Sequence, residues 1–234
     1  MDYQNIFANI ATGLSVIYYI SLVIPFYKVL RCQLTYEFTP ITYITTIYAD
    51  SLTWYLYATR LQYDQLKLCN LLGFFTTLIL IIIYIAFELK QNIFDSLLNI
   101  LMLILGSLAL HKSLSLTIAE PKFIGRVCIV TKLLSFFIPI VSICKVIKEN
   151  NNKYISIKSS LIYMSSFIGW ILYGIAINDN IIMYSNAAGI LLCFIQLLVY
   201  LIYKNNKKPS KRKSKAIGDY ERKTLKKVKI KMDY

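Results

Sequence analysis

Long apolar stretches separated by short polar segments make up most of the first 203 residues. A bilayer core about 30 Å thick requires roughly 20 mostly apolar residues for each crossing helix. The pattern predicts seven such helices, at about residues 7–30, 38–59, 66–88, 93–110, 123–146, 155–177 and 181–203. The connecting segments are short, as at 60–65 and 178–180. We therefore predict an all-α membrane protein with seven transmembrane helices.

Composition and charge distribution fit this interpretation. The chain is 57% hydrophobic and 16% charged, whereas soluble proteins average roughly 45–50% and 25%. Of its 26 basic residues, 13 follow residue 203, so that with three acidic residues the tail carries +10 of the net charge of +14. A nucleic-acid-binding protein carries its basic surface on the folded body, so we expect no nucleic-acid partner. Residues 205–234 are predicted to be a disordered tail that binds anionic lipid, or alternatively only anchors the topology.

The distribution of basic residues predicts the orientation in the membrane. With the N-terminus outside, the inner segments hold 20 Lys and Arg residues and the outer segments hold 6, with Lys132 counted among the outer ones. The side with more basic residues is the cytoplasmic one. We expect an outside N-terminus and a cytoplasmic C-terminus, in the plasma membrane or, as the alternative, in an endomembrane such as the Golgi.

Catalytic and metal-binding patterns are missing from the sequence. The five cysteines are scattered without a C-x-x-C pair, and a single histidine cannot complete a Cys/His metal set. A nucleophile motif such as G-x-S-x-G and a nucleotide-binding motif are also absent. We therefore expect no enzymatic activity, no catalytic or metal-binding residues and no cofactor.

An internal repeat divides the chain. The two tryptophans, Trp54 and Trp170, are 116 residues apart. The same offset joins Tyr57 with Tyr173, Asn70 with Asn186, Gly73 with Gly189 and Tyr84 with Tyr200, and an offset of 114 joins Ser21 with Ser135 and Pro25 with Pro139. Four crossings separate each pair of matching spans, and because four is even the halves run in the same direction. We predict repeats at 1–90 and 123–204, joined by a linker helix and outer loop at 91–122. Parallel repeats place a shared site at their interface.

The repeated stretches resemble the SWEET family of sugar transporters over about residues 7–204. The similar segments are T-Y-E-F-T-P-I-T-Y through W-Y-L-Y-A, N-L-L-G-F, and W-I-L-Y-G through S-N-A-A-G. The resemblance implies facilitative, gradient-driven sugar transport by alternating access through two three-helix repeats, and a homo-oligomer. It also implies roles for eight residues: Asn70 and Asn186 would hydrogen-bond the sugar, Trp54 and Trp170 would flank it, Pro25 and Pro139 would be hinges, and Tyr57 and Tyr173 would belong to gates.

Two departures from the family pattern concern the hinges. Family members usually carry further prolines in the second and sixth spans, where this chain has Tyr43 and Ser156. We therefore expect only half of the usual set of hinge prolines.

The chemistry of the repeated residues suits a small neutral sugar, mono- or disaccharide. An amide both donates and accepts hydrogen bonds without carrying charge, and an indole face packs against the C–H face of a sugar ring. Because the Asn and Trp residues are duplicated in the two halves, we interpret them as one binding slot. Taken singly, each Asn could be a contact between helices and each Trp an interfacial residue. Ser21 and Ser135 lie four residues before the prolines, and we expect them to line the pocket beside the sugar.

Asp50 is the unusual residue of the predicted spans. It precedes Trp54 by four residues, and its repeat counterpart is the uncharged Ser166. A carboxylate in mid-membrane costs about 2.5–3.5 kcal/mol, so we expect it to face the pore or a partner, as a sugar-hydroxyl acceptor or a proton-sensitive gate. The remaining alternative is a solvated position near the membrane surface. A carrier of another small polar solute, proton-coupled through Asp50, is the second functional hypothesis.

Overall fold

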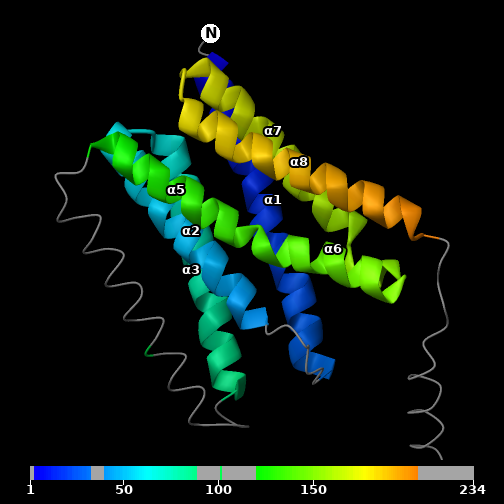
Figure 1. Cartoon of the computed structure of the whole chain (residues 1–234). Helices are drawn as coiled ribbons and strands as arrows, with labels where there is room; N and C mark the ends of the chain where they lie inside the picture. Colours follow the sequence, from blue (N-terminus) through cyan, green and yellow to red (C-terminus); the bar gives the residue numbers. More distant parts are fainter. Residues whose placement is uncertain (1–2, 33–39, 89–100, 102–119, 205–234) are drawn as a thin grey trace, which may run out of the picture.

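The computed structural model describes residues 3–32, 40–88, 101 and 120–204, and these parts of the chain form a helical bundle (Figure 1). The helices are α1 (Tyr3–Cys32), α2 (Pro40–Leu61), α3 (Asp64–Glu88), α5 (Pro121–Ser135), α6 (Phe137–Glu149), α7 (Ile157–Ala176) and α8 (Asn180–Ile202), with a 3-10 turn η1 (Asn152–Tyr154) before α7. The prediction of an all-α protein is confirmed. The expected fourth span at 93–110 lies outside the described residues except for Leu101, and the tail at 205–234 lies outside them entirely.

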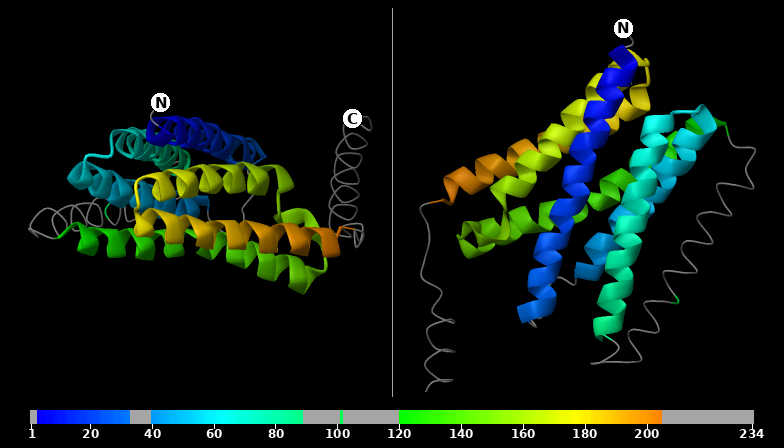
Figure 2. Two further views of the ribbon diagram at one scale, coloured as in Figure 1. Left: turned by 90° about the horizontal axis from the view of Figure 1, so that it is seen from above. Right: turned by 180° about the vertical axis from the view of Figure 1, so that it is seen from behind.

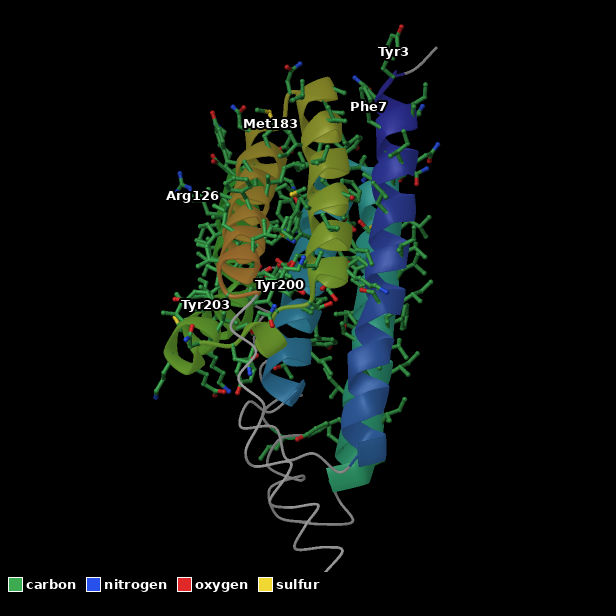
Figure 3. The ribbon with its side chains drawn as sticks, turned by 90° about the vertical axis from the view of Figure 1, so that its right-hand side faces the viewer. Tyr3, Phe7, Arg126, Met183, Tyr200 and Tyr203 are labelled. Carbon is green, nitrogen blue, oxygen red and sulfur yellow. The ribbon has the colours of Figure 1, made fainter. Side chains whose placement is uncertain are left out.

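Five segments of the described chain are long and apolar enough to cross a membrane. They are Tyr3–Val23, Asp64–Ala86, Pro121–Glu149, Ile157–Ala176 and Asn180–Ile202. Their outward faces carry large apolar side chains that would be costly in water, such as Ile20 and Leu191, each 61% exposed. Figure 3 shows side chains projecting outward all around the bundle. Helix α2 is less apolar because it contributes Asp50, Ser51 and Thr53 to the buried interior.

The described helices form two groups, one of α1, α2 and α3 and the other of α5, α6, α7 and α8, and the groups meet along two seams. Helix α3 packs against α1 and α2, and α7 packs against α8. The seams between the groups are the contact of α1 with α7 and the contact of α2 with α5 (Figure 2). Tyr3 at the start of α1 and Met183 near the start of α8 lie at one end of the bundle, and Tyr203 lies toward the other (Figure 3). We call the first of these ends the Tyr3 end.

The predicted fifth span at 123–146 is interrupted. Helix α5 ends at Ser135, α6 begins at Phe137, and Pro139 lies in the first turn of α6. Proline has no N–H to donate to the carbonyl of Ser135, and its ring clashes with that carbonyl, which explains the break at this turn. In the first half, α1 continues as one helix through Pro25; the side chain of Pro25 lies outside the described part of the chain.

The repeat extends to the backbone of the two helix-helix turns at the Tyr3 end. Gln62, after α2, has φ 59°, and Asn178, after α7, has φ 56°. In each turn the N–H of the next residue donates to the carbonyl of the residue five positions earlier. These hydrogen bonds run from Tyr63 to Ala58 and from Asp179 to Gly174, both at 2.9 Å. This pairing and the left-handed residue are typical of a Schellman C-cap. Equivalent positions of the two halves thus end their helices in the same way.

Candidate functional site

A cavity of about 50 Å³ lies between the two groups of helices. Trp54 and Asn70 line it from the first half, and Trp170 and Asn186 line it from the second. All four are buried, with at most 8% of their surface exposed. The structure therefore brings together, around one cavity, the four residues for which the sequence predicts sugar contacts.

The two asparagines are held in the same way. Asn70 Nδ2 donates to the carbonyl of Leu66 at 2.8 Å, and Asn186 Nδ2 donates to the carbonyl of Ile182 at 2.7 Å. Each bond joins the amide to the residue four positions earlier in its own helix. Since an amide has two N–H donors and a carbonyl oxygen, one donor and the acceptor of each side chain remain for a ligand.

The repeated glycines bring aromatic rings up to this cavity. A Cβ added at Gly73 would collide with the ring of Tyr19, and one added at Gly189 would lie 2.6 Å from the ring of Phe167. Both rings line the cavity. Glycine is required here because any larger side chain would push a ring out of its place.

Each indole N–H is held by a hydrogen bond, directly to the residue one turn earlier in the first half and through Ser15 of α1 in the second. Trp54 Nε1 donates to Asp50 Oδ1 at 3.1 Å. Trp170 Nε1 donates to Ser15 Oγ at 2.8 Å, and that hydroxyl forms a further hydrogen bond of 2.8 Å with Ser166. Asp50 and Ser166 are repeat counterparts, so the two halves use one architecture with a carboxylate in one copy and hydroxyls in the other.

Asp50 has a charged partner, Lys132, which the count of basic residues assigns to an outer segment. Lys132 Nζ lies 2.8 Å from Asp50 Oδ2, and Thr131 Oγ1 lies 3.3 Å from Asp50 Oδ1. The assignment of Lys132 to an outer segment is therefore wrong, because it lies within α5 and lines the central cavity. The placement of Asp50 at a solvated membrane surface is also wrong, since only 7% of it is exposed. Asp50 instead faces a charged partner beside the larger cavity. The sequence predicts that this carboxylate faces either the pore or a partner.

Aromatic side chains close the central cavity toward the Tyr3 end. Tyr57 packs edge-on against Trp54 with ring centroids 5.6 Å apart, and Tyr173 packs in the same way against Trp170 at 5.7 Å. Tyr63 bridges them, with centroids 6.5 Å from Tyr57 and 6.2 Å from Tyr173. These five rings form a continuous layer, which we call the aromatic seal.

One hydrogen bond fastens this seal to the second half. Tyr57 Oη donates to Asp179 Oδ2 at 2.7 Å, while Asp179 Oδ1 accepts from the N–H groups of Ile181 and Ile182 and caps α8. Burial, and then the nearby Asp179 carboxylate, raise the pKa of the Tyr63 phenol above its ordinary value. Tyr63 and Asp179 lie outside the residues that sequence reasoning selected, because they are not identical in the two repeats.

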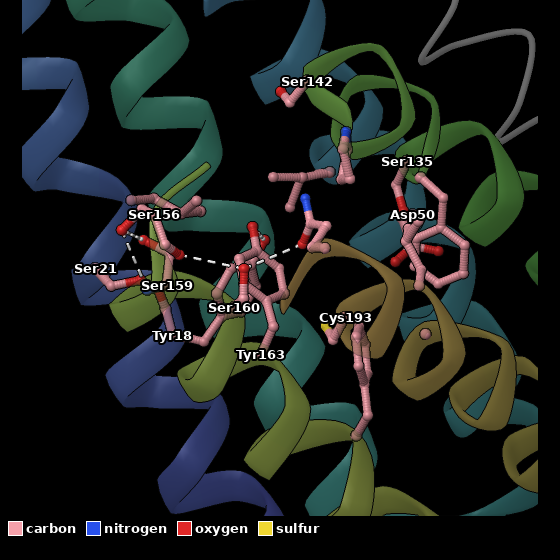
Figure 4. Close-up of a pocket in the computed structure, with 18 of the residues that line it drawn as sticks. Tyr18, Ser21, Asp50, Ser135, Ser142, Ser156, Ser159, Ser160, Tyr163 and Cys193 are labelled. Carbon is pink, nitrogen blue, oxygen red and sulfur yellow. Dashed lines mark hydrogen bonds between the residues drawn. The ribbon is translucent and has the colours of Figure 1, made fainter. Parts of the chain in front are cut away.

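A larger cavity of about 240 Å³ adjoins the central one (Figure 4). The two share the lining residues Tyr18, Tyr19, Lys132 and Phe167. Ser21, Ser135 and Pro139 line the larger cavity and not the central one. Polar groups from α7 and α8 also face it, including Ser160, whose hydroxyl donates to Gln196 Oε1 at 3.1 Å.

The position where the family usually has a proline in the sixth span is explained by helix capping. Ser156 precedes α7, and its hydroxyl accepts from the N–H of Ser159. It therefore lies outside the helix, where it caps the first turn. The corresponding Tyr43 lies within α2, but its side chain is outside the described part of the chain.

Among the described residues, no group of three or more His, Cys, Asp or Glu side chains is placed to hold a metal ion. The polar and aromatic groups that line the central cavity include two amides, two indoles, hydroxyls and the ammonium of Lys132. Such a lining can hydrogen-bond a polar ligand and pack against its apolar faces.

A protein family and several known proteins are similar to this chain in sequence. A family described as sugar efflux transporters for intercellular exchange matches residues 5–92 and 122–208. The bidirectional sugar transporter SWEET11 of Arabidopsis thaliana is 27% identical over 85% of this chain and 70% of its own length. The protein of the same name from Oryza sativa subsp. japonica is 24% identical over 82% of this chain, which spans 64% of that relative.

The fold is also that of a solved transporter. The structure of a eukaryotic SWEET transporter superimposes with a TM-score of 0.71 and 19% identity, covering 86% of this chain and 97% of that one. At this identity the likeness establishes the fold. The matched family covers both halves of the sequence repeat, and the chain belongs to the MtN3/SWEET family of sugar transporters.

Proposed function

We propose that this protein is a facilitative sugar carrier that works by alternating access, with the sugar bound in the central cavity between the two halves. The observation that carries the proposal is the convergence of Trp54, Trp170, Asn70 and Asn186 on one buried cavity. An unpaired sugar hydroxyl in a dry site costs about 1–3 kcal/mol. The amide groups left over from the helix hydrogen bonds supply partners of either polarity, and the indoles supply apolar faces.

The two ends of the pathway differ in a way that suits alternating access. The aromatic seal closes the central cavity toward the Tyr3 end, while the larger cavity adjoins it on another side. With the N-terminus outside, this is an inward-facing state. The reverse state requires the seal to open and the larger cavity to close. In this proposal Tyr57 and Tyr173 act as gate residues, and Pro25 and Pro139 as hinges.

Uptake of radiolabelled glucose and sucrose by hexose-transport-deficient cells tests the proposal. We expect saturable uptake by the wild type and its loss in Asn186→Ala. Asn180→Ala is a matched control, because Asn180 is exposed at the start of the same helix, and it is expected to transport normally. Surface expression is measured for each protein. A surface-expressed wild type that takes up neither sugar would refute the proposal.

The second candidate is a carrier of another small polar solute that is proton-coupled through Asp50. The observation that favours it is a carboxylate beside the cavity. Three donors, from Trp54, Thr131 and Lys132, already engage that carboxylate, and this supports a sugar uniporter instead. Uptake measured from pH 5 to 8 separates the two, because proton coupling requires a dependence on the proton gradient.

For the location we propose the plasma membrane, with an outside N-terminus and a cytoplasmic tail. The excess of basic residues beyond residue 203 supports this orientation. Epitope tags at each terminus, stained before and after permeabilisation, test it. Binding of the tail to anionic lipid and assembly into a homo-oligomer are further proposals, which vesicle binding and crosslinking test separately.

A further inference from the structure

The ion pair between Asp50 and Lys132 joins the two halves of the protein beside the central cavity. Asp50 belongs to α2 and Lys132 to α5, along one of the two seams. The side chains are 9% and 18% exposed, respectively. Both line the larger cavity, and Lys132 also lines the central one. A ligand that passes between the two cavities therefore passes the Lys132 ammonium.

Hydrogen bonding distinguishes the two members of the pair. Asp50 is engaged at both oxygens, by Trp54 and Thr131 at Oδ1 and by Lys132 at Oδ2. Lys132 makes one hydrogen bond among the described residues, although an ammonium has three N–H donors. Its other neighbours are the rings of Trp54 and Phe167, 5.9 and 5.8 Å from Nζ. Aromatic faces attract a cation but do not replace an oxygen acceptor.

We propose that Lys132, held in place by Asp50, is a specificity-determining hydrogen-bond donor to one hydroxyl oxygen of the transported sugar. The inference rests on the proposed sugar transport and adds a charged contact to a site whose other hydrogen-bonding side chains are mainly amides and hydroxyls. Asp50 is the positioning residue: it fixes the ammonium at 2.8 Å and balances its charge.

The pair also suits an uncharged substrate. Asp50 balances the charge of Lys132, so the pair adds no net charge to the site. The hydroxyl oxygen of an uncharged sugar accepts the strong hydrogen bond of a cationic donor. The site therefore orients a neutral sugar through one hydroxyl.

Comparison of the two halves supports a function specific to this position. The counterparts of Asp50 and Lys132 in the other seam are Ser166 and Tyr18, both uncharged. Ser166 and Ser15 form a hydroxyl network that holds the indole of Trp170, and Asp50 holds the indole of Trp54. Both indoles are thus held by a hydrogen bond of similar length. Because hydroxyls suffice to fix the indole, the charge at Asp50 and Lys132 is not needed for that purpose.

Competition by the monodeoxy derivatives of glucose against radiolabelled glucose uptake tests the inference. In the wild type, removing the hydroxyl that contacts Lys132 should weaken inhibition about tenfold or more, as expected for a hydrogen bond to a charged group. The double variant Asp50→Asn/Lys132→Met removes both charges and leaves neither member unpaired. In it, discrimination at that ring position should fall to about twofold, with the other positions unchanged. Lys122→Met, an exposed site at the start of the same helix, should keep the wild-type pattern.

The exchanged variant Asp50→Lys/Lys132→Asp distinguishes substrate contact from a structural role. It retains an ion pair between α2 and α5 but places the ammonium on the other helix. A purely structural pair predicts the wild-type pattern of deoxyglucose inhibition, and our inference predicts a different one. The inference is refuted if the exchanged variant keeps that pattern, or if wild-type protein that transports glucose is inhibited equally by every deoxyglucose. A surface-expressed wild type that takes up neither glucose nor sucrose refutes the proposed function itself, and one that takes up sucrose alone is tested in the same way with monodeoxy derivatives of sucrose.

Discussion

The hydrogen bond between Tyr57 and Asp179 should control how often the aromatic seal opens. The substitution Tyr57→Phe removes the hydroxyl and keeps the ring that packs against Trp54 and Tyr63. A buried hydrogen bond to a charged group contributes about 1.5–3 kcal/mol, and every 1.4 kcal/mol is a factor of ten in an equilibrium. The ratio of open to closed seal should therefore rise about 10- to 100-fold.

A native cysteine reports on this opening. Cys69 is 2% exposed and lines the central cavity directly behind the seal. In a variant that keeps Cys69 and replaces the other cysteines by alanine, a membrane-impermeant thiol reagent is applied from the Tyr3 end. If closed protein does not react, the modification rate follows the open fraction. We expect Tyr57→Phe to react at least tenfold faster than its parent.

The repeat supplies a matched control. Tyr173 occupies the equivalent position and packs on Trp170 in the same manner. The phenol that donates a hydrogen bond to Asp179, however, is that of Tyr57. Tyr173→Phe should therefore leave the modification rate within about twofold of the parent. Equal acceleration by both substitutions, or acceleration by neither, would contradict the assignment of the seal to this hydrogen bond.

Three further predictions concern packing, bending and charge. Gly189→Ala should raise the KM for sugar uptake several-fold, since its Cβ would displace the Phe167 ring from the cavity wall; concentration dependence of uptake measures this, and an unchanged KM counts against the cavity as the site. Pro139→Ala should restore a hydrogen bond to Ser135 and join α5 to α6, giving a higher melting temperature and slower uptake. Asp50→Asn should lower the melting temperature by leaving Lys132 unpaired, at a cost of about 3 kcal/mol or more, and adding Lys132→Met should restore it.

Much of the fold follows from the spacing of apolar residues. Five of the six described spans agree with the predicted ones to within a few residues at each end, as in α8, predicted at 181–203 and found at 180–202. The exception is the fifth span, where the pattern predicts one apolar segment with a hinge at Pro139 and the structure has two helices, broken after Ser135. Hydrophobicity alone cannot reveal this break because Pro139 disrupts the backbone of a stretch that is apolar on both sides. The proline itself is the signal for it.

The misplaced Lys132 shows where reasoning from charge fails. Counting basic residues on each side of the membrane treats every lysine as part of a polar segment, and Lys132 lies ten residues into a span predicted at 123–146. A usable signal was present: Asp50 and Lys132 are opposite charges within predicted spans, and buried charges in membranes usually have partners. The offset of 114 also aligns Lys132 with Tyr18, which lies in mid-span.

Identity between the repeats explains which site residues could be predicted and which could not. Trp54, Asn70 and their counterparts match in the sequence, so the repeat reveals them, and they lie around the central cavity. The residues that fasten the seal and charge the cavity wall lie where the halves differ. Position 63 is tyrosine and its counterpart 179 is aspartate, although the two turns share one backbone geometry.

This difference has a mechanical consequence. Two identical halves with the same residues at both turns would meet across the seal with like groups, tyrosine against tyrosine or carboxylate against carboxylate. Asp179 gives the phenol of Tyr57 an acceptor across the interface, and because the other turn carries Tyr63 in place of a second carboxylate, no like charges meet at the seal. Duplication builds the neutral slot from matching residues, whereas the hydrogen bond that fastens the seal and the ion pair beside the cavity lie at positions where the halves differ.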